Sequence, residues 1–217
     1  MDKTILVSGS SGMIGKALCM KLEAEGFEVR KLKRSSVDLG TNEFFWNPKE
    51  SEIDILAIEG ADCVVHLAGE PIAQNWNQKS RKAISDSRIL GTRLLVESMK
   101  LAESKAKFIS SSGINFYGAK IGLHTDGEDA IINGADGFLS EVCHEWEAEA
   151  KSLVESGNSV ICLRTGVVLN KKGGALARML PAFQLALGGV IGSGKQWMSW
   201  IELDDLVKVI LWSINSD

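Results

Sequence analysis

The segment from Thr4 to Gly15 constrains the fold more than any other part of the chain. It opens with Thr4–Val7, a short apolar run with β-branched residues, which predicts a buried strand. Glycines follow at intervals of three, and the amphipathic stretch Lys16–Glu25 after them predicts a helix. Strand, glycine turn and helix in this order are typical of a dinucleotide-binding unit.

Each glycine of the turn has a predicted task. Gly9 lets the chain turn sharply off the strand, Gly12 lets the backbone approach a pyrophosphate, and Gly15 lets the helix pack closely. The spacing is G-x-x-G-x-x-G and not G-x-G-x-x-G, so a tight turn without a ligand is the alternative interpretation. The predicted cofactor contacts in this turn are Gly9, Ser10, Ser11, Gly12, Met13, Ile14 and Gly15.

The rest of the chain alternates between apolar runs and amphipathic stretches. Such alternation predicts an α/β protein with a Rossmann-like, doubly wound parallel sheet. Residues 38–50 read as irregular, and residues 113–137 as a loop over the active edge. We expect strands over 27–32, 62–69, 107–109 and 160–163, apolar residues at helical spacing over 53–58, and helices over 77–102, 138–155 and 203–215.

Composition excludes several classes of protein. A net charge of −4 gives no basic field for nucleic acid, and no apolar run approaches the length that spans a bilayer. The four cysteines lack C-x-x-C spacing and read as reduced core residues of a cytoplasmic protein, and a strand begins too early for a signal peptide. Cys63 and His66 lie on opposite faces of their strand, so we predict no metal site.

Several longer motifs carry a family resemblance: SGSSGMIG, VVHLAGEPI, SRILGTRLL, FISSSGINFYG, RTGVVLNKKGGAL and GSGKQWMSWIELDD. With them the chain resembles the extended short-chain dehydrogenases/reductases that include nucleotide-sugar epimerases. It is most similar to an atypical bacterial branch known as epimerase-family proteins. The resemblance implies an NAD(P)-binding domain over residues 1–170 and part of a smaller substrate-binding region over 171–217. It also implies that related chains continue for some tens of residues, so we expect a partly open pocket here.

The resemblance also implies where the cofactor and the substrate lie. The smaller region, with Met198, Ser199 and Trp200, would lie near the substrate, although Trp197 and Trp200 are equally consistent with simple packing. Arg88 stands where the superfamily usually has an Asn. Further cofactor contacts are expected at Leu67, Ala68, Gly69, Arg88, Ser110, Gly166 and Val167.

The resemblance implies chemistry by a Ser, a Tyr and a Lys four residues after the Tyr. Ser112 matches the serine, but Ile121 follows the only tyrosine, Tyr117, at the lysine position. Alignment of the next helix through Glu147 puts Leu139 and Cys143 at the Tyr and Lys positions. The predicted catalytic residues are therefore Ser112 and Tyr117, both facing the nicotinamide end of the cleft. Ser112 would polarise a carbonyl, unless it merely caps backbone groups at the strand end.

The end of the second predicted strand indicates the cofactor. It reads Lys33-Arg34-Ser35, where an NAD-binding unit has an acidic residue for the ribose hydroxyl. A guanidinium suits a 2′-phosphate, so the sequence predicts NADP(H), bound by Arg34 and Ser35. The alternative is that Lys33 and Arg34 form a solvated strand end.

Two functions remain open at this stage. One is an NADP(H)-dependent oxidoreductase or nucleotide-sugar epimerase, whose small-molecule substrate, such as a sugar nucleotide, is unknown. The other is an NADP(H)-binding sensor without turnover, which the missing Tyr and Lys favour. Either a monomer or a homodimer is compatible with the sequence.

Overall fold

The predicted glycine turn joins the central strand of a parallel sheet to its first helix. In the computed structural model, which describes residues 3–118, 137–190 and 192–216, seven strands form one sheet in the order β4-β3-β2-β1-β5-β6-β7. Every neighbouring pair is parallel except β3 with β4. The strands are β1 Thr4–Ser8, β2 Glu28–Lys33, β3 Glu43–Asn47, β4 Glu52–Ile53, β5 Cys63–His66, β6 Lys107–Gly113 and β7 Val160–Thr165.

The strand order reverses between β1 and β5, which lie side by side with Ile5 opposite Cys63. The chain runs outward from β1 to β3 on one side and from β5 to β7 on the other. In open α/β sheets, ligands bind at the carboxyl ends of the strands beside such a reversal. The predicted doubly wound Rossmann-like fold is confirmed, and its topology places a ligand crevice beside the glycine turn.

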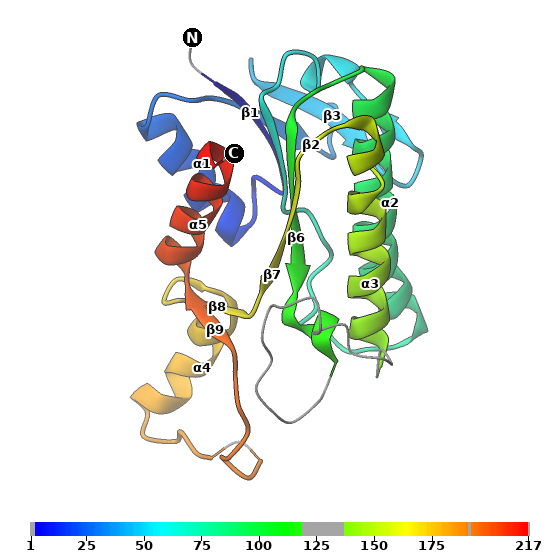
Figure 1. Cartoon of the computed structure of the whole chain (residues 1–217). Coiled ribbons are helices and arrows are strands. Elements are labelled where there is room, and N and C mark those ends of the chain that lie inside the picture. Colours follow the sequence, from blue (N-terminus) through cyan, green and yellow to red (C-terminus); the bar gives the residue numbers. More distant parts are fainter. Residues whose placement is uncertain (1–2, 119–136, 191, 217) are drawn as a thin grey trace.

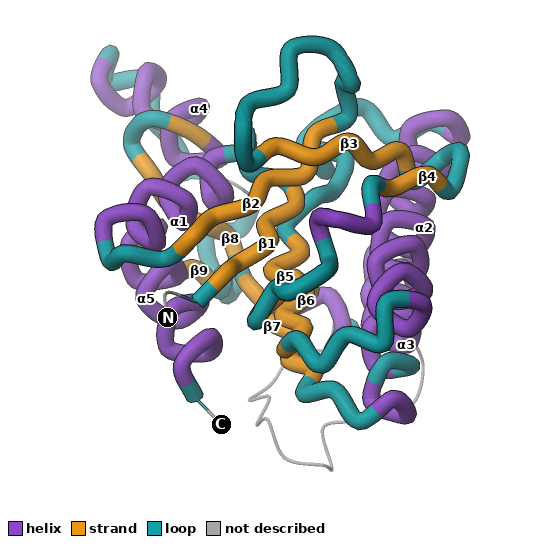
Figure 2. Tube along the Cα trace, turned by 90° about the horizontal axis from the view of Figure 1, so that it is seen from above, coloured by secondary structure: helices purple, strands orange, loops and turns teal. Residues whose placement is uncertain are grey.

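Helices cover both faces of the sheet (Figures 1 and 2). α1 Met13–Ala24 and α5 Leu203–Asn215 pack on one face, in a core that includes Ile5 and Val7 of β1. α2 Gln78–Leu101 and α3 Phe138–Lys151 cover the other face. The core there includes Leu6 of β1, and residues of α2 and α3. Because parallel sheets are buried on both faces, all five residues of β1 are buried.

Residues 38–50 contain a strand, so their prediction as irregular is wrong. β3 pairs with β2, and its residue Trp46 is buried in the core below α2. The aromatic run Phe44-Phe45-Trp46 favours a strand, but its neighbours are polar and the turn at Asn47-Pro48 dominated the interpretation. The other predicted elements exist with shifted ends: α3 stops at Lys151, and residues 55–57 form a single 3₁₀ turn.

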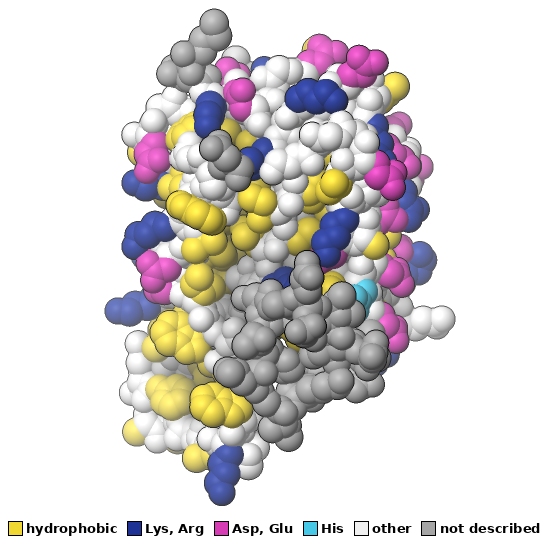
Figure 3. All heavy atoms as spheres, viewed as in Figure 1, with side chains coloured by type: hydrophobic (Ala, Val, Ile, Leu, Met, Phe, Trp, Pro, Cys, Tyr) yellow, Lys and Arg dark blue, Asp and Glu magenta, His cyan; other side chains and the backbone are white. Residues whose placement is uncertain are grey.

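The segment after β7 departs from the main sheet. β8 Val167–Asn170 and β9 Trp200–Glu202 form a small parallel sheet of their own, and α4 Gly174–Gln184 follows β8. Hydrophobic side chains gather at this end of the molecule (Figure 3), where Phe183, Leu187 and Trp197 are exposed. The chain then returns to the main layers through α5, which packs beside α1.

None of the helices described here has the length and apolar character needed to cross a membrane. All four cysteines are free, and Cys19, Cys63 and Cys143 are buried.

Candidate functional site

The glycine turn is shaped by contacts that exclude side chains. Gly9 has φ +70°, and a Cβ there would lie 2.8 Å from the backbone nitrogen of Ala68. A Cβ on Gly15 would lie 2.2 Å from the carbonyl oxygen of Gly9. The turn therefore requires glycine at both positions, and Gly15 allows the close packing expected of it.

The first turn of α1 is open to a ligand. Its N-cap is Gly12, which has no side chain to cap the helix, and no acidic residue lies in the first turn. The backbone N–H groups there lack intrahelical partners, and the helix dipole adds partial positive charge. An uncapped helix N-terminus of this kind is suited to a phosphate group.

Two hollows meet beside this turn. The first, which we call the glycine groove, has a volume of about 490 Å³ and runs past the glycine turn to the ends of β2 and β3. Arg34 lines it, as does Lys33, whose ammonium pairs with Glu43 at 3.0 Å. The predicted cofactor contacts that line this groove are Gly9, Ser11, Gly12, Arg34, Leu67, Ala68 and Gly69.

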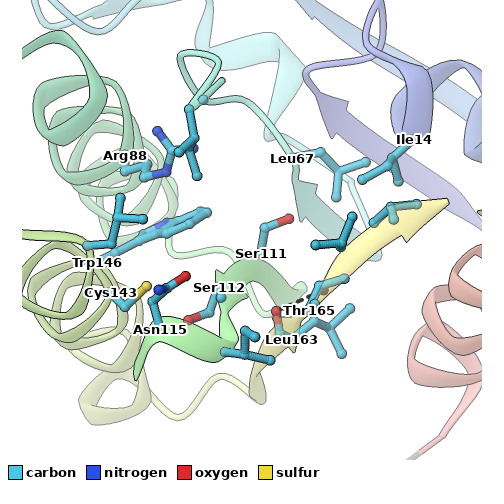
Figure 4. A pocket seen from close by; sticks show the side chains of 18 of the residues that line it. Ile14, Leu67, Arg88, Ser111, Ser112, Asn115, Cys143, Trp146, Leu163 and Thr165 are labelled. Carbon is cyan, nitrogen blue, oxygen red and sulfur yellow. Dashed lines mark hydrogen bonds between the residues drawn. The ribbon is translucent and has the colours of Figure 1, made fainter. Parts of the chain in front are cut away.

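The second hollow, which we call the serine cavity, lies at the ends of β6 and β7 and also measures about 490 Å³ (Figure 4). Its walls are mainly apolar, and the polar side chains that line it come from Arg88, Ser111, Ser112, Asn115 and Thr165. Leu67, Ala68 and Gly69 line both hollows, so these join at the end of β5. The predicted residues found here are Ile14, Leu67, Ala68, Gly69, Arg88, Ser112, Gly166 and Val167.

Six predicted site residues line neither hollow. Gly15 acts through packing, as described above. Met13 lies against Gly173, and the buried Ser10 hydroxyl has no hydrogen-bond partner among the described residues. The Ser110 hydroxyl donates a 3.0 Å hydrogen bond to the carbonyl oxygen of Ser111, whereas Ser111 and Ser112 line the serine cavity. The complete set is Ser10, Met13, Gly15, Ser35, Ser110 and Tyr117.

Ser112 is held by a buried carboxylate. Its hydroxyl donates a 2.7 Å hydrogen bond to Oε1 of Glu147 on α3, a residue only 2% exposed. Arg164 of β7 grips the same carboxylate with two bonds, Nε to Oε1 at 2.8 Å and Nη2 to Oε2 at 2.9 Å. Lys151 adds a further bond to Oε2 at 2.9 Å. Both carboxylate oxygens are thus fully engaged.

These contacts fix the charge of Glu147 and the direction of the Ser112 proton. Burial acts to raise the pKa of Glu147, but the hydrogen bonds from Arg164, Ser112 and Lys151 outweigh it and hold the pKa below its ordinary value. Glu147 is therefore ionised and accepts the Ser112 proton. Ser112 presents its oxygen lone pairs to the cavity, so it is set to accept a hydrogen bond, whereas polarising a carbonyl requires it to donate one.

Tyr117 does not line the serine cavity. Its hydroxyl accepts a 3.0 Å hydrogen bond from Nη1 of Arg164, and the same guanidinium lies 3.5 Å from the centre of the Phe116 ring. Tyr117 sits in the one-turn 3₁₀ helix Ile114–Tyr117, directly after β6. Its contacts support the Arg164 side of the site. The loop expected over 113–137 lies mostly outside the described residues.

α3 presents Leu139 and Cys143 to the serine cavity, at the positions that sequence alignment assigned to Tyr and Lys. Burial raises the pKa of the Cys143 thiol, so this side chain is neutral. Among the described residues that line the cavity, ionisable side chains come from Cys143 and Arg88 alone. Neither side chain gains or loses a proton near neutral pH, so neither is suited to act as a general acid or base.

Arg88 of α2 reaches the wall of the serine cavity and is only 8% exposed. Its Nη1 donates to the carbonyl oxygens of Glu70 at 3.1 Å and Ile84 at 3.0 Å. The guanidinium carbon lies 5.3 Å from the centre of the Trp146 ring and would lie 3.2 Å from a Cβ on Gly69. Gly69 therefore leaves room for a buried cation beside the junction of the two hollows.

His66 is a core residue. Its Nδ1 lies 2.6 Å from the hydroxyl of Ser8, and its ring packs among Trp46, Phe108 and Trp146. Burial lowers its pKa to about 3, so the imidazole is neutral. No three His, Cys, Asp or Glu side chains of the described chain gather in a way that could hold a metal ion.

The sequence interpretation missed Glu147, Arg164 and Trp146 as site residues. A signal was present for two of them: Cys143, Trp146, Glu147 and Ala150 recur at helical spacing and are all buried. Glu147 was hidden among glutamates of the exposed face of α3. No local pattern connects it to Arg164, which arrives from the next strand.

Comparison with known proteins agrees with this geometry. The model of the family described as NAD dependent epimerase/dehydratase matches residues 5–217. The chain belongs to this family. An epimerase family protein of Mycobacterium leprae is 38% identical over 213 residues, which cover 97% of this chain and 67% of that protein. A chloroplastic homologue of SDR39U1 from Arabidopsis thaliana is 36% identical over 95% of this chain and 61% of its own length.

Two solved structures extend the comparison. The human epimerase family protein SDR39U1 (isoform 2), crystallised with NADPH, superposes with a TM-score of 0.85 at 31% identity, over 98% of this chain and 70% of that one. A nucleoside-diphosphate sugar epimerase from Corynebacterium glutamicum gives a TM-score of 0.79 at 34% identity, over 99% of this chain. The chain spans 44% of the length of that structure.

Proposed function

We propose that this protein binds NADP(H) across the two hollows and is an oxidoreductase or nucleotide-sugar epimerase acting on a small organic substrate. The observation that carries the proposal is the junction of the glycine groove with the serine cavity at Leu67–Gly69, beside an uncapped helix N-terminus. An elongated dinucleotide needs a site of this form: two compartments with a phosphate cradle between them. The NADPH in the SDR39U1 crystal structure supports the same cofactor here.

The residues divide the cofactor between the two hollows. Gly9 and Gly12 would hold the pyrophosphate, and Arg34 would bind the 2′-phosphate from the end of β2. Ile14, Gly166 and Val167 would surround the nicotinamide in the serine cavity. Bound there, the nicotinamide supplies hydride transfer. The division of the chain into a cofactor part up to residue 170 and a substrate part after it remains part of this proposal, although α5 packs with the cofactor part.

Ser112 orients the substrate in this scheme. Because its proton is committed to Glu147, its oxygen accepts a hydrogen bond from a substrate hydroxyl and holds that hydroxyl at the carboxyl edge of the sheet. The apolar walls exclude water around the reacting carbon. Tyr117 contributes indirectly, through its contact with Arg164.

A cofactor assay tests the proposal through Arg34. Charge-assisted bonds contribute about 1.5–3 kcal/mol each, so Arg34→Ala should weaken NADPH binding by about tenfold to a hundredfold and change NADH binding little. Titration of cofactor fluorescence measures both. Lys31→Ala is the matched control, because Lys31 is a cation of the same strand that pairs with Glu23 outside the groove. Equal loss of both cofactors, or loss of neither, contradicts the role of Arg34.

A second function, an NADP(H) sensor without turnover, is favoured by one specific observation. Leu139 and Cys143 stand where the resemblance places the catalytic Tyr and Lys, and the cavity-lining residues described here include neither type. Mixing the NADPH complex with a panel of carbonyl compounds separates the two functions. Oxidation of NADPH by any of them excludes the pure sensor, and unchanged NADPH across the panel excludes reduction of the carbonyl compounds tested.

A further inference from the structure

Arg88 is a buried cation that forms no ion pair with any described residue. No carboxylate of the described residues lies within 4.0 Å of its guanidinium, although the other guanidinium of the site, Arg164, has Glu147. Glu70, whose carbonyl oxygen binds Arg88, lines the glycine groove and not the serine cavity. Burial of a charge is costly unless a partner and hydrogen bonds compensate it. The Trp146 ring and two carbonyl oxygens compensate only part of this cost.

The unused edge of the guanidinium has a defined shape. Both hydrogen bonds that Arg88 forms with described residues come from Nη1, so Nε and Nη2 have no partner among those residues. In this same chain, Arg164 uses Nε and Nη2 to hold the two oxygens of the Glu147 carboxylate. Among the described residues, no nitrogen of Arg88 is both fully buried and without a hydrogen-bond partner. Its Nε and Nη2 atoms, which have no partner, are therefore still accessible to a ligand.

The position of Arg88 argues against a cofactor phosphate as its partner. It lines the serine cavity but not the glycine groove, where Gly9 and Gly12 lie. Figure 4 shows Arg88 on the opposite side of the cavity from Ile14, which belongs to the first turn of α1. The phosphate cradle and the Arg88 guanidinium therefore line different hollows, which join at Leu67–Gly69.

From these observations we infer that Arg88 binds a carboxylate group of the substrate, through a two-bond fork at Nε and Nη2. The inference rests on the proposed function for the identity of the cavity as a substrate site. It changes the predicted role of Arg88 from cofactor contact to substrate recognition. Within the proposed function, it narrows the substrate to molecules that carry a carboxylate, an apolar part that packs near Trp146 and a hydroxyl that reaches Ser112. A guanidinium edge matches the planar carboxylate better than an ammonium would.

Matched probe molecules test the inference without any mutation. Benzoate and benzamide have nearly the same shape and differ in charge, and inorganic phosphate is an anion of different geometry. We would titrate all three into the protein with and without NADPH, following tryptophan fluorescence and calorimetry. The expected result is that benzoate binds at least tenfold more tightly than benzamide and is not displaced by equimolar phosphate. Equal binding of benzoate and benzamide overturns the inference, and preference for phosphate overturns the assignment to a carboxylate.

Variants then assign the preference to Arg88. Arg88→Gln should remove the preference for benzoate, and Arg88→Lys should reduce it because charge remains without the fork. Arg93→Gln, which removes an exposed cation from the same helix, should keep the preference. NADPH affinity should stay within threefold in all variants. Retention of the preference in Arg88→Gln contradicts the inference, as does a parallel loss of NADPH affinity.

The cofactor titration keeps the two proposals distinguishable. If the wild-type protein binds benzoate through Arg88 but does not bind NADPH, the proposed function fails and the carboxylate site stands. If NADPH binds and the charge of the probe has no effect, the proposed function stands and the carboxylate site fails.

Discussion

Two guanidinium groups lie near the serine cavity, Arg88 buried and Arg164 half-buried, and their charges are compensated in opposite ways. The Nε and Nη2 atoms of Arg164 bind Glu147, its remaining nitrogen is bonded to Tyr117, and its face lies against Phe116. Arg88 forms the opposite wall with its fork free. The first arrangement completes its own interactions and shapes the site. The second leaves a buried charge without an ion pair, which costs stability unless an anionic group of a ligand binds it.

The comparison also explains why Ser112 differs from a simple hydrogen-bond donor. Arg164 and Lys151 keep Glu147 ionised, and Glu147 takes the proton of Ser112. The Arg164–Glu147 pair therefore makes Ser112 a hydrogen-bond acceptor toward the cavity. The unpaired Nε and Nη2 atoms of Arg88 make another part of the cavity lining a hydrogen-bond donor.

The largest effect should come from removing the filled fork. Arg164→Met leaves Glu147 buried with Lys151 as its only cation, so we expect the free energy of unfolding to fall by about 3 kcal/mol, the lower end for breaking a buried pair. Urea unfolding measures it. Arg93→Met is the control, because the pair of Arg93 with Glu149 is exposed and should cost at most about 1 kcal/mol. Similar losses of unfolding free energy in both variants would show that the pair of Arg164 with Glu147 stabilises the fold no more than an exposed pair does.

Removing the free fork should have the opposite sign. Arg88→Met replaces an uncompensated buried cation by an apolar side chain of similar length. We expect the unfolding free energy of the ligand-free protein to stay the same or rise by up to about 1 kcal/mol. The same urea measurement checks it. A loss of more than about 2 kcal/mol would mean that Arg88 is chiefly structural.

A smaller effect should appear in the pH dependence of stability. The pKa of Glu147 is lowered in the folded protein, so its contribution is fully present above its ordinary value of 4.5 and is lost as pH falls through the folded value. Wild-type protein should therefore lose stability relative to Glu147→Gln on acidification below pH 4.5. Urea midpoints of both proteins from pH 6 to pH 3 measure the difference. A constant difference across this range would contradict an ionised Glu147.

The sequence predicts the glycine turn and its surroundings better than the side-chain contacts around Ser112. The glycine turn, the strand before it and Arg34 follow from patterns within a few residues, and such local patterns reflect local backbone geometry. Ser112 and Arg88 also fall in the cavity as expected. Ser111 lines the cavity and Ser110 does not, and a run of three serines does not reveal this difference.

The interior depends on pairings between distant segments. Glu147 meets Ser112 across 35 residues and Arg164 across 17, and nothing in either neighbourhood signals the partner. Tyr117 illustrates the consequence. As the only tyrosine of the chain it was the natural candidate for catalysis, and only the fold shows that its hydroxyl faces Arg164 instead of the cavity.

The central claim is that one dinucleotide spans the glycine groove and the serine cavity. A crystal structure of the protein with NADPH tests it most directly. The account predicts the pyrophosphate at the first turn of α1, the 2′-phosphate in contact with Arg34, and the nicotinamide beside Ser112, with the Arg88 fork still free of cofactor atoms. A nicotinamide outside the serine cavity, or a cofactor phosphate bound to Arg88, would contradict it.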